Sequence, residues 1–206
     1  MSAPIREVPI DPAHAALLII DVQNYCTAGQ AGQSEYFRHS LGDVVLPNTQ
    51  RLQSACRGAG IEVAYSVIEN MTCDGRDRSL DYKISGIDVP RGSWDARVLE
   101  EIAPAADEMI FRKTSSSVFI STNIDYVLRN LGVRSLIIAG IMTDQCVESA
   151  VRDACDLGYL VTLATDACTT ASAERHQQSL IGIRGYCRQR VTDAIVDEIA
   201  ALTHSR

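Results

Sequence analysis

Aromatic residues and long apolar runs are scarce in this sequence. Its 206 residues include one Trp and three Phe, and no apolar run reaches the roughly 18 residues that a membrane helix needs. The N-terminal residues lack the basic-then-apolar pattern of a signal peptide. We therefore expect a cytoplasmic protein with no membrane partner.

Positive charge is in short supply as well. The 19 Lys and Arg residues are outnumbered by 26 Asp and Glu residues, which gives a net charge of −7. A protein that binds the phosphate backbone of nucleic acids normally shows the opposite sign and a basic stripe. Nucleic acid is therefore not an expected partner.

Metal-binding and disulfide patterns are also missing. The four histidines show no paired zinc-ligand spacing, and the seven cysteines contain no CxxC. An odd number of cysteines in a chain of this length does not predict a disulfide framework. We expect no metal ion and no other cofactor.

What the sequence does contain is an alternation of strand-like and helix-like segments. Short apolar runs predict buried strands of a parallel sheet, and apolar positions at helical spacing, ended by glycine, predict helices between them. Strands are expected over residues 15–21, 61–68, 108–113, 135–139 and 159–164, with a short one over 188–191. Helices are expected over residues 44–58, 123–130, 145–157, 172–183 and 192–202. This order predicts a single α/β domain over residues 1–206, a three-layer α/β/α fold with a Rossmann-like, doubly wound, mostly parallel sheet.

The segment over residues 69–94 departs from this alternation. It carries many charges, three glycines and little periodicity. A loop of this length in a compact domain is usually functional or mobile. We expect it to be a lid over the ligand site, and a plain surface excursion is the alternative.

Three residues with reactive side chains stand at or just after predicted strand ends. Asp21 closes the first strand, Lys113 closes the third, and Cys146 follows the fourth at the start of a helix. Ligands in doubly wound folds bind beyond the carboxyl ends of the strands, so these distant residues can meet there. Taken singly, each has a structural explanation as a turn cap, a solvated lysine or a buried thiol.

Together the three side chains would form an activated nucleophile. The helix N-terminus and Lys113 would both stabilise a Cys146 thiolate, and Asp21 could accept the thiol proton as a base. Backbone N–H groups of the strand-to-helix turn could hold an oxyanion.

Three segments around these residues resemble the motifs of the isochorismatase-like cysteine hydrolase family. They are LLIIDVQN at 17–24, FRKTSSSVF at 111–119 and IAGIMTDQCV at 138–147, and the likeness extends over about residues 15–202. The resemblance implies the isochorismatase-like hydrolase fold and a catalytic triad of Asp21, Lys113 and Cys146. It also implies a cis peptide bond between Ile141 and Met142, and an oxyanion hole formed by the backbone N–H groups of Met142 and Cys146.

Two features narrow the function within that family. Isochorismatase itself lacks the nucleophilic cysteine and cleaves an enol ether, so the presence of Cys146 favours covalent acyl chemistry on an amide. Nicotinamidases carry an Asp-x-His-type metal motif after the second strand, where this chain has SVIENMTCD over 66–74, without a histidine. No metal site of the nicotinamidase type is therefore predicted.

Polar residues near the same edge of the sheet are candidates for binding substrate. These candidates are Gln23, Tyr25, Glu69, Asn70 and Arg78. In ureide-type members, polar groups after the second strand bind a carbamoyl or amide group, and the scarcity of Trp and Phe argues against a large aromatic pocket. We predict an amidohydrolase that cleaves a C–N bond of a small, linear amide, ureide or carbamoyl compound through a thioester, as a homodimer or homotetramer.

Other functions stay open on the sequence alone. One is a non-catalytic oligomeric protein of the same fold, and another is an isochorismatase-type hydrolase that forms no covalent intermediate. A third is a redox sensor with Cys146 as its reactive thiol, although Cys155, nine residues on along the same helix, is poorly placed to pair with it. A dinucleotide-binding protein is not favoured, because no GxGxxG follows the first strand.

Overall fold

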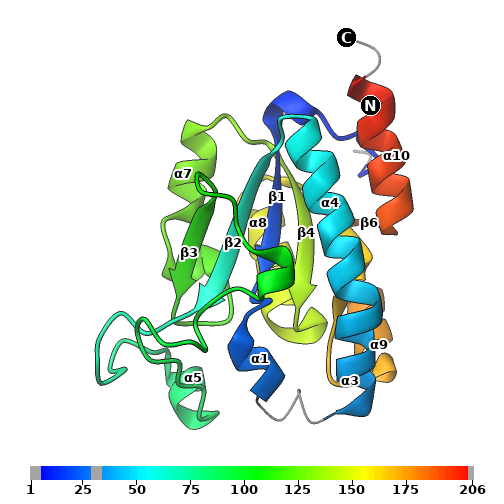
Figure 1. Ribbon diagram of the computed structural model, residues 1–206. Helices are drawn as coiled ribbons and strands as arrows, with labels where there is room; N and C mark the ends of the chain where they lie inside the picture. The colour runs from blue at the N-terminus through cyan, green and yellow to red at the C-terminus, as the bar shows by residue number, and fades with distance from the viewer. Residues whose placement is uncertain (1–5, 29–33, 204–206) are drawn as a thin grey trace.

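Six parallel strands form the central sheet in this computed structural model, which describes residues 6–28 and 34–203 (Figure 1). The strand order is β3-β2-β1-β4-β5-β6, and every neighbouring pair is parallel. The strands are β1 (Ala15–Ile20), β2 (Glu62–Ile68), β3 (Met109–Lys113), β4 (Ser135–Ile141), β5 (Leu160–Thr169) and β6 (Arg188–Arg190). The predicted α/β class and its parallel sheet are confirmed.

Strand β1 shows why the sheet is covered on both faces. All six of its residues are buried, and successive side chains of a strand point to opposite faces. Leu18 and Ile20 pack into one hydrophobic cluster, whereas Leu17 and Ile19 pack into another. An uninterrupted apolar run is thus the pattern of a central strand with a core on each side.

Helices form a layer on each face of the sheet (Figure 1). Leu52 and Ile195 join the cluster of Leu17 on one face, and Leu128 joins that of Leu18 on the other. The helices of the first face are α4 (Leu46–Gly58) and α10 (Thr192–Thr203); those of the second are α6 (Val118–Ser121), α7 (Ile124–Asn130), α8 (Glu148–Asp156) and α9 (Ala173–Ile183). The three-layer fold is therefore confirmed. None of the described helices is long and apolar enough to span a membrane.

The sequence pattern misses several short elements. They are η1 (Pro12–His14), α1 (Asn24–Ala28), α3 (Glu35–Ser40), α5 (Leu80–Ile84), η3 (Glu100–Ile102) and α6. The turns η2 (Leu41–Val45) and η4 (Thr143–Val147) overlap the starts of two predicted helices. The predicted helix over 44–58 is in fact the end of a longer one, because α3 continues through the π-helical turn η2 into α4. The ring of Pro47 would clash with the Asp43 carbonyl in a regular helix. The wider turn, in which the Leu46 N–H donates to the Leu41 carbonyl, lets the helix continue.

Strand β5 also runs beyond its predicted end, to Thr169. The register between β4 and β5 shifts between Ile138 and Gly140, after which Cys168 and Thr169 resume the pairing. The extra residues carry β5 alongside the end of β4 at the carboxyl edge of the sheet.

The order of the strands reverses between β1 and β4. The chain runs from β1 outward to β2 and β3, then returns to place β4 on the other side of β1. Ligand sites in doubly wound folds lie at such a switch point. Gly140 lets the two strands approach closely there, because its φ is +124° and a Cβ would lie 2.2 Å from the Ile20 carbonyl oxygen. The Ile141–Met142 peptide bond that follows is cis.

Residues 69–94, which include α5, lie at the carboxyl end of the sheet together with α1 (Figure 1). Tyr82 and Val89 pack with Ile68 and Ala96 in a small apolar cluster, separate from the two clusters that flank the sheet. The segment is therefore folded around a core of its own beside the switch point.

Candidate active site

Asp21 follows β1 with a left-handed backbone, at a φ of +54°. Such a conformation costs a residue with a Cβ on the order of 1–3 kcal/mol and persists only where the surroundings enforce it. Here the Asp21 N–H donates to the Ser66 carbonyl at 3.0 Å, and the Asp21 carbonyl accepts from the Gln23 N–H at 2.9 Å. The Ser66 hydroxyl also donates to Asp21 Oδ1 at 2.8 Å. These bonds fix the direction of a buried carboxylate.

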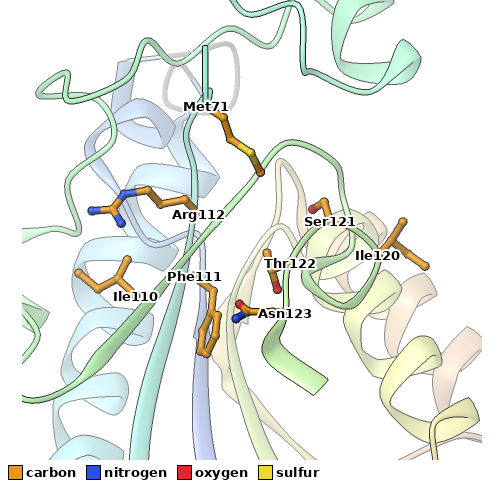
Figure 2. Close-up of a pocket in the computed structure, with 8 residues that line it drawn as sticks. All are labelled: Met71, Ile110, Phe111, Arg112, Ile120, Ser121, Thr122 and Asn123. Carbon is orange, nitrogen blue, oxygen red and sulfur yellow. The ribbon is translucent and has the colours of Figure 1, made fainter. Parts of the chain in front are cut away.

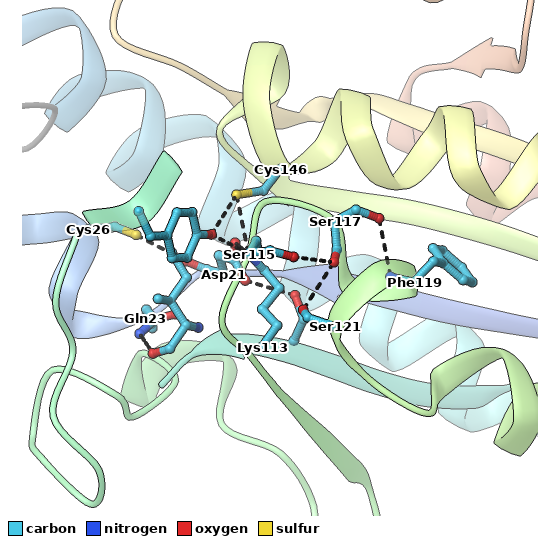
Figure 3. Close-up of polar contacts among 12 residues, drawn as sticks. Asp21, Gln23, Cys26, Lys113, Ser115, Ser117, Phe119, Ser121 and Cys146 are labelled. Atoms are coloured by element: carbon cyan, nitrogen blue, oxygen red, sulfur yellow. Dashed lines mark hydrogen bonds and ion pairs between the residues drawn. The ribbon is translucent and has the colours of Figure 1, made fainter. Parts of the chain in front are cut away.

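Lys113, the last residue of β3, directs a fully buried ammonium to this carboxylate (Figure 3). Its Nζ lies 2.8 Å from Asp21 Oδ2 and donates to the Ser115 carbonyl at 2.9 Å. Burial disfavours the ammonium, but the attraction of Asp21, followed by that of Cys146, outweighs burial and raises the pKa of Lys113. Lys113 is therefore charged at neutral pH.

Cys146 completes the cluster from the turn η4, with its Sγ 3.4 Å from Lys113 Nζ (Figure 3). Burial raises the pKa of the Cys146 thiol to about 12; Lys113 opposes this rise and Asp21 adds to it. Burial thus favours the neutral thiol, whereas Lys113 favours the thiolate, as its position beside Cys146 predicts.

The turn that carries Cys146 is held by polar contacts from α9. Thr143 Oγ1 lies 2.9 Å from His176 Nδ1, and both side chains are buried. Asp144 Oδ2 accepts a hydrogen bond of 2.6 Å from Arg175 Nε. Burial lowers the pKa of His176, which keeps its ring neutral at neutral pH. The position of the sulfur thus depends on a neighbouring helix as well as on β4.

Three further residues, none of them predicted as a site residue, surround the cluster. Tyr82, from the 69–94 segment, places its hydroxyl 2.9 Å from Lys113 Nζ and 3.8 Å from Cys146 Sγ. Ser66 lies on β2 in register with the end of β1, and Cys26 donates from Sγ to the Asp21 carbonyl at 3.2 Å. Ser66 alone carries a sequence signal, as a hydroxyl within an apolar strand.

Gln23 and Tyr25, predicted to bind substrate, differ in their freedom to do so. The Gln23 amide is buried; its Nε2 donates to the carbonyls of Ile68 and Asp95 at 3.0 and 2.9 Å, and its Oε1 accepts from the Ile68 N–H at 2.6 Å. Gln23 therefore ties β1 to β2. Tyr25 is partly buried against the cluster that contains Tyr82, and burial raises its pKa.

Asn70 and Arg78 hold the 69–94 segment in shape. Asn70 Nδ2 donates to Asp88 Oδ1 at 2.7 Å. Arg78 donates from Nε to the Gly75 carbonyl and from Nη1 to the Ile87 carbonyl, both at 2.9 Å. Gly75 has a φ of +63°, and a Cβ there would lie 2.8 Å from Arg78 Nε. Both predicted substrate ligands therefore form their hydrogen bonds within the 69–94 segment itself.

Glu69 is engaged in a similar way, on the side of β3 away from Lys113. Its carboxylate accepts from the Gly92 N–H at 2.8 Å and from Arg112 Nε at 2.6 Å. Glu69 and Arg112 both line a cavity of about 290 Å³. A second cavity, of about 480 Å³, is lined by Met71, Ile110, Phe111, Arg112, Ile120, Ser121, Thr122 and Asn123 (Figure 2). Neither of these two cavities includes a residue of the Asp21–Lys113–Cys146 cluster.

Within the described ranges 6–28 and 34–203, no three His, Cys, Asp or Glu side chains are arranged to hold a metal ion. All seven cysteines are free thiols.

Comparisons with known proteins agree with this fold. The chain matches the isochorismatase domain over residues 15–195. It is 30% identical over 203 residues to the ureidoacrylate amidohydrolase RutB of Agrobacterium fabrum, with 88% of each chain covered. The RutB of Acinetobacter baylyi is 28% identical over 204 residues, which cover 90% of this chain and 83% of that one.

Solved structures show the same likeness. A cysteine hydrolase from Pseudomonas syringae pv. phaseolicola has a TM-score of 0.85 at 27% identity, with 98% of this chain and 99% of that chain covered. The six-stranded parallel sheet with helices on both faces is the three-layer α/β/α fold that this likeness supports. The chain belongs to the isochorismatase-like cysteine hydrolase family, as its three motifs predict.

Proposed function

We propose that this protein is an amidohydrolase that uses Cys146 as a nucleophile to cleave a non-peptide C–N bond in a small polar amide, ureide or carbamoyl compound. The observation that carries the proposal is the buried cluster at the switch point. There the Lys113 ammonium lies 2.8 Å from the Asp21 carboxylate and 3.4 Å from the Cys146 sulfur. A nucleophile, a base and a fixed cation are the groups that acyl transfer requires.

The relatives support the same reaction class. RutB proteins are named ureidoacrylate amidohydrolases, and the protein from Pseudomonas syringae is named a cysteine hydrolase. The names of these relatives indicate hydrolysis of an amide C–N bond and a catalytic cysteine. The cluster offers Cys146 as the thiol nucleophile for that reaction.

In the first half-reaction, Asp21 takes the proton from the Cys146 thiol as the sulfur attacks the substrate carbonyl carbon. Because burial raises the pKa of the Cys146 thiol, a general base at Asp21 assists the attack at neutral pH. The backbone N–H groups of Met142 and Cys146 would hold the oxyanion. Collapse breaks the C–N bond, and Asp21 gives its proton to the departing ammonia or amine.

In the second half-reaction, water hydrolyses the thioester. Asp21 takes a proton from that water as its oxygen attacks the acyl carbon, the C–S bond breaks, and the proton returns to the sulfur. Lys113 forms no bond to the substrate; it balances the charge that moves between the carboxylate and the sulfur. Its contacts with Asp21 and Ser115 hold it in place for this role.

Residues 69–94 would act as the lid over this site. The side chains of Lys113 and Asp21 are almost fully buried and Cys146 is 6% exposed, so we expect a substrate to reach the sulfur when this cover moves. A closed site excludes water and strengthens the electrostatic interactions inside it. Tyr25, at the border of the segment's apolar cluster, is the predicted substrate ligand best placed to contact a bound molecule.

The direct test is ammonia release from a panel of ureides, carbamoyl amino acids, lactams and nicotinamide. We expect turnover of a small linear member of the panel by the unmodified protein, and none by Cys146→Ala. Cys73→Ala is the matched control, because Cys73 is an exposed free thiol. Near-normal turnover by Cys146→Ala would contradict the proposal and favour hydrolysis without a covalent step.

Denaturing mass spectrometry gives an independent test of the covalent step. Protein mixed with a slowly hydrolysed substrate should gain the mass of one acyl group, and peptide mapping should place that group on Cys146. An active enzyme that forms an adduct elsewhere would exclude Cys146 as the nucleophile.

A further inference from the structure

In the 69–94 segment, the side chain of Tyr82 contacts both Lys113 and Cys146. It lies on α5 and is 1% exposed, although its neighbours Leu80 and Ile84 are more than two-thirds exposed. Its hydroxyl oxygen lies 2.9 Å from Lys113 Nζ and 3.8 Å from Cys146 Sγ. The segment therefore places a single phenol beside both the ammonium and the sulfur, which lie 3.4 Å apart.

The direction of the two hydrogen bonds follows from the charge of Lys113. An ammonium carries three hydrogens and no acceptor, so the Tyr82 oxygen must accept from Nζ. The phenol hydrogen then points to another partner, and the remaining contact of this hydroxyl is Cys146 Sγ. Tyr82 is thus placed to donate to the sulfur.

We propose that Tyr82 is a further catalytic residue, which donates a hydrogen bond to Cys146 Sγ and stabilises the thiolate. This inference rests on the proposed function and deepens it. As Asp21 removes the thiol proton, the sulfur keeps the electron pair that forms the C–S bond, and Tyr82 keeps its own proton. When that bond breaks, the electron pair returns to the sulfur, and the phenol donates to it until Asp21 returns the proton.

The surroundings suit a donor that never ionises. Burial, followed by repulsion from a charged Cys146, raises the pKa of Tyr82, so the phenol keeps its hydrogen at neutral pH. The ring is fixed by packing against Ile68, Val89 and Ala96. The hydroxyl therefore reaches the sulfur only when the 69–94 segment is seated, which couples closure of the lid to activation of the nucleophile.

The test is the rate at which iodoacetamide alkylates Cys146 in Tyr82→Phe, measured peptide by peptide over a pH series without substrate. The variant keeps the ring and removes the donor. A hydrogen bond to a charged group is worth enough that we expect alkylation about 10- to 100-fold slower at a given pH. Cys73, exposed in the same chain, is the internal reference and should not change. Tyr126→Phe is the matched control, because Tyr126 is exposed on α7. In this variant, iodoacetamide should alkylate Cys146 at the normal rate.

The sign of the change separates this role from simple shielding. Faster alkylation of Cys146 would show that Tyr82 only covers the sulfur, and an unchanged rate would show that it makes no contribution; either result overturns the inference. If Tyr82→Phe does not fold, 3-fluorotyrosine at position 82 replaces it. This stronger acid should speed alkylation, and no change would overturn the inference.

Activity measurements then separate the two proposals. With a confirmed substrate, Tyr82→Phe should lower kcat and leave KM nearly unchanged, whereas a higher KM alone would assign Tyr82 to binding and overturn the inference. Alkylation needs no substrate. If no amide is hydrolysed but alkylation slows as expected, the proposed function fails while the contact between Tyr82 and the thiolate stands.

Discussion

Two neighbouring residues of β3, Arg112 and Lys113, each pair with a carboxylate that follows another strand. Arg112 Nε lies 2.6 Å from Glu69 Oε2, and Lys113 Nζ lies 2.8 Å from Asp21 Oδ2. The distances are alike but the surroundings are not, since the side chain of Arg112 is 61% exposed and that of Lys113 is 0% exposed. Two ion pairs of similar length at one edge of the sheet therefore differ in burial, and we expect them to differ in function.

The difference comes from the pleat of the strand. Successive side chains of β3 point to opposite faces, so Lys113 turns toward the switch point while Arg112 turns toward the cavity lined by Glu69. One pair lies beside Cys146, the proposed nucleophile, with Lys113 Nζ 3.4 Å from its sulfur. The other fastens the start of the 69–94 segment to β3, because Glu69 also accepts from the Gly92 N–H.

The largest expected effect is the loss of activity in Asp21→Asn. The change keeps the shape of the side chain and removes the base, so turnover should fall by roughly 10²- to 10⁴-fold. The measurement is ammonia release per folded protein, with circular dichroism to determine the folded fraction. Asp107→Asn, an exposed carboxylate near the opposite end of β3, is the control, and equal losses in both variants would refute the assignment of Asp21.

Lys113→Met should cost the most stability. The substitution leaves the buried Asp21 carboxylate without its counter-charge, and breaking a buried pair from one side typically costs about 3–5 kcal/mol. Urea denaturation would measure the free energy of unfolding. A loss below about 1 kcal/mol, the range of exposed pairs, would show that the two ion pairs are not as different as their burial indicates.

Glu69→Ala should lower the free energy of unfolding by an intermediate amount. It leaves the Gly92 N–H and the Arg112 guanidinium without their acceptor; because both residues are exposed, water can replace it, and we expect a loss of about 1 kcal/mol, the net worth of a hydrogen bond. Urea denaturation and the KM of a confirmed substrate should be measured on the same preparation. A raised KM with unchanged stability would return Glu69 to the role of substrate ligand.

Arg112→Ala should have the smallest effect. The guanidinium is largely exposed, and such pairs are worth about 0–1 kcal/mol. The free energy of unfolding should therefore change by no more than that. A loss as large as that of Lys113→Met would mean that the outer pair is as important to the fold as the inner one.

The sequence by itself determined the layers of the fold and the three residues of the cluster. The apolar run of β1 shows a strand buried on both faces, and in a parallel sheet the residues after such strands share one edge. Asp21, Lys113 and Cys146 could therefore be named from their places at strand ends and from the three motifs. Periodicity and strand ends are local properties, which is why they can be followed along the chain.

Only the tertiary structure decided what surrounds that cluster. Glu69 and Asn70 follow β2 as Asp21 follows β1, yet they are engaged by Arg112 and Asp88. Tyr82 stands in a segment without periodicity, and contacts with Ile68, Val89 and Ala96 turn its hydroxyl to the sulfur. The rise in the pKa of the Cys146 thiol likewise follows from burial. Burial and side-chain direction in a loop depend on residues distant in sequence, so a local sequence pattern does not predict either of them.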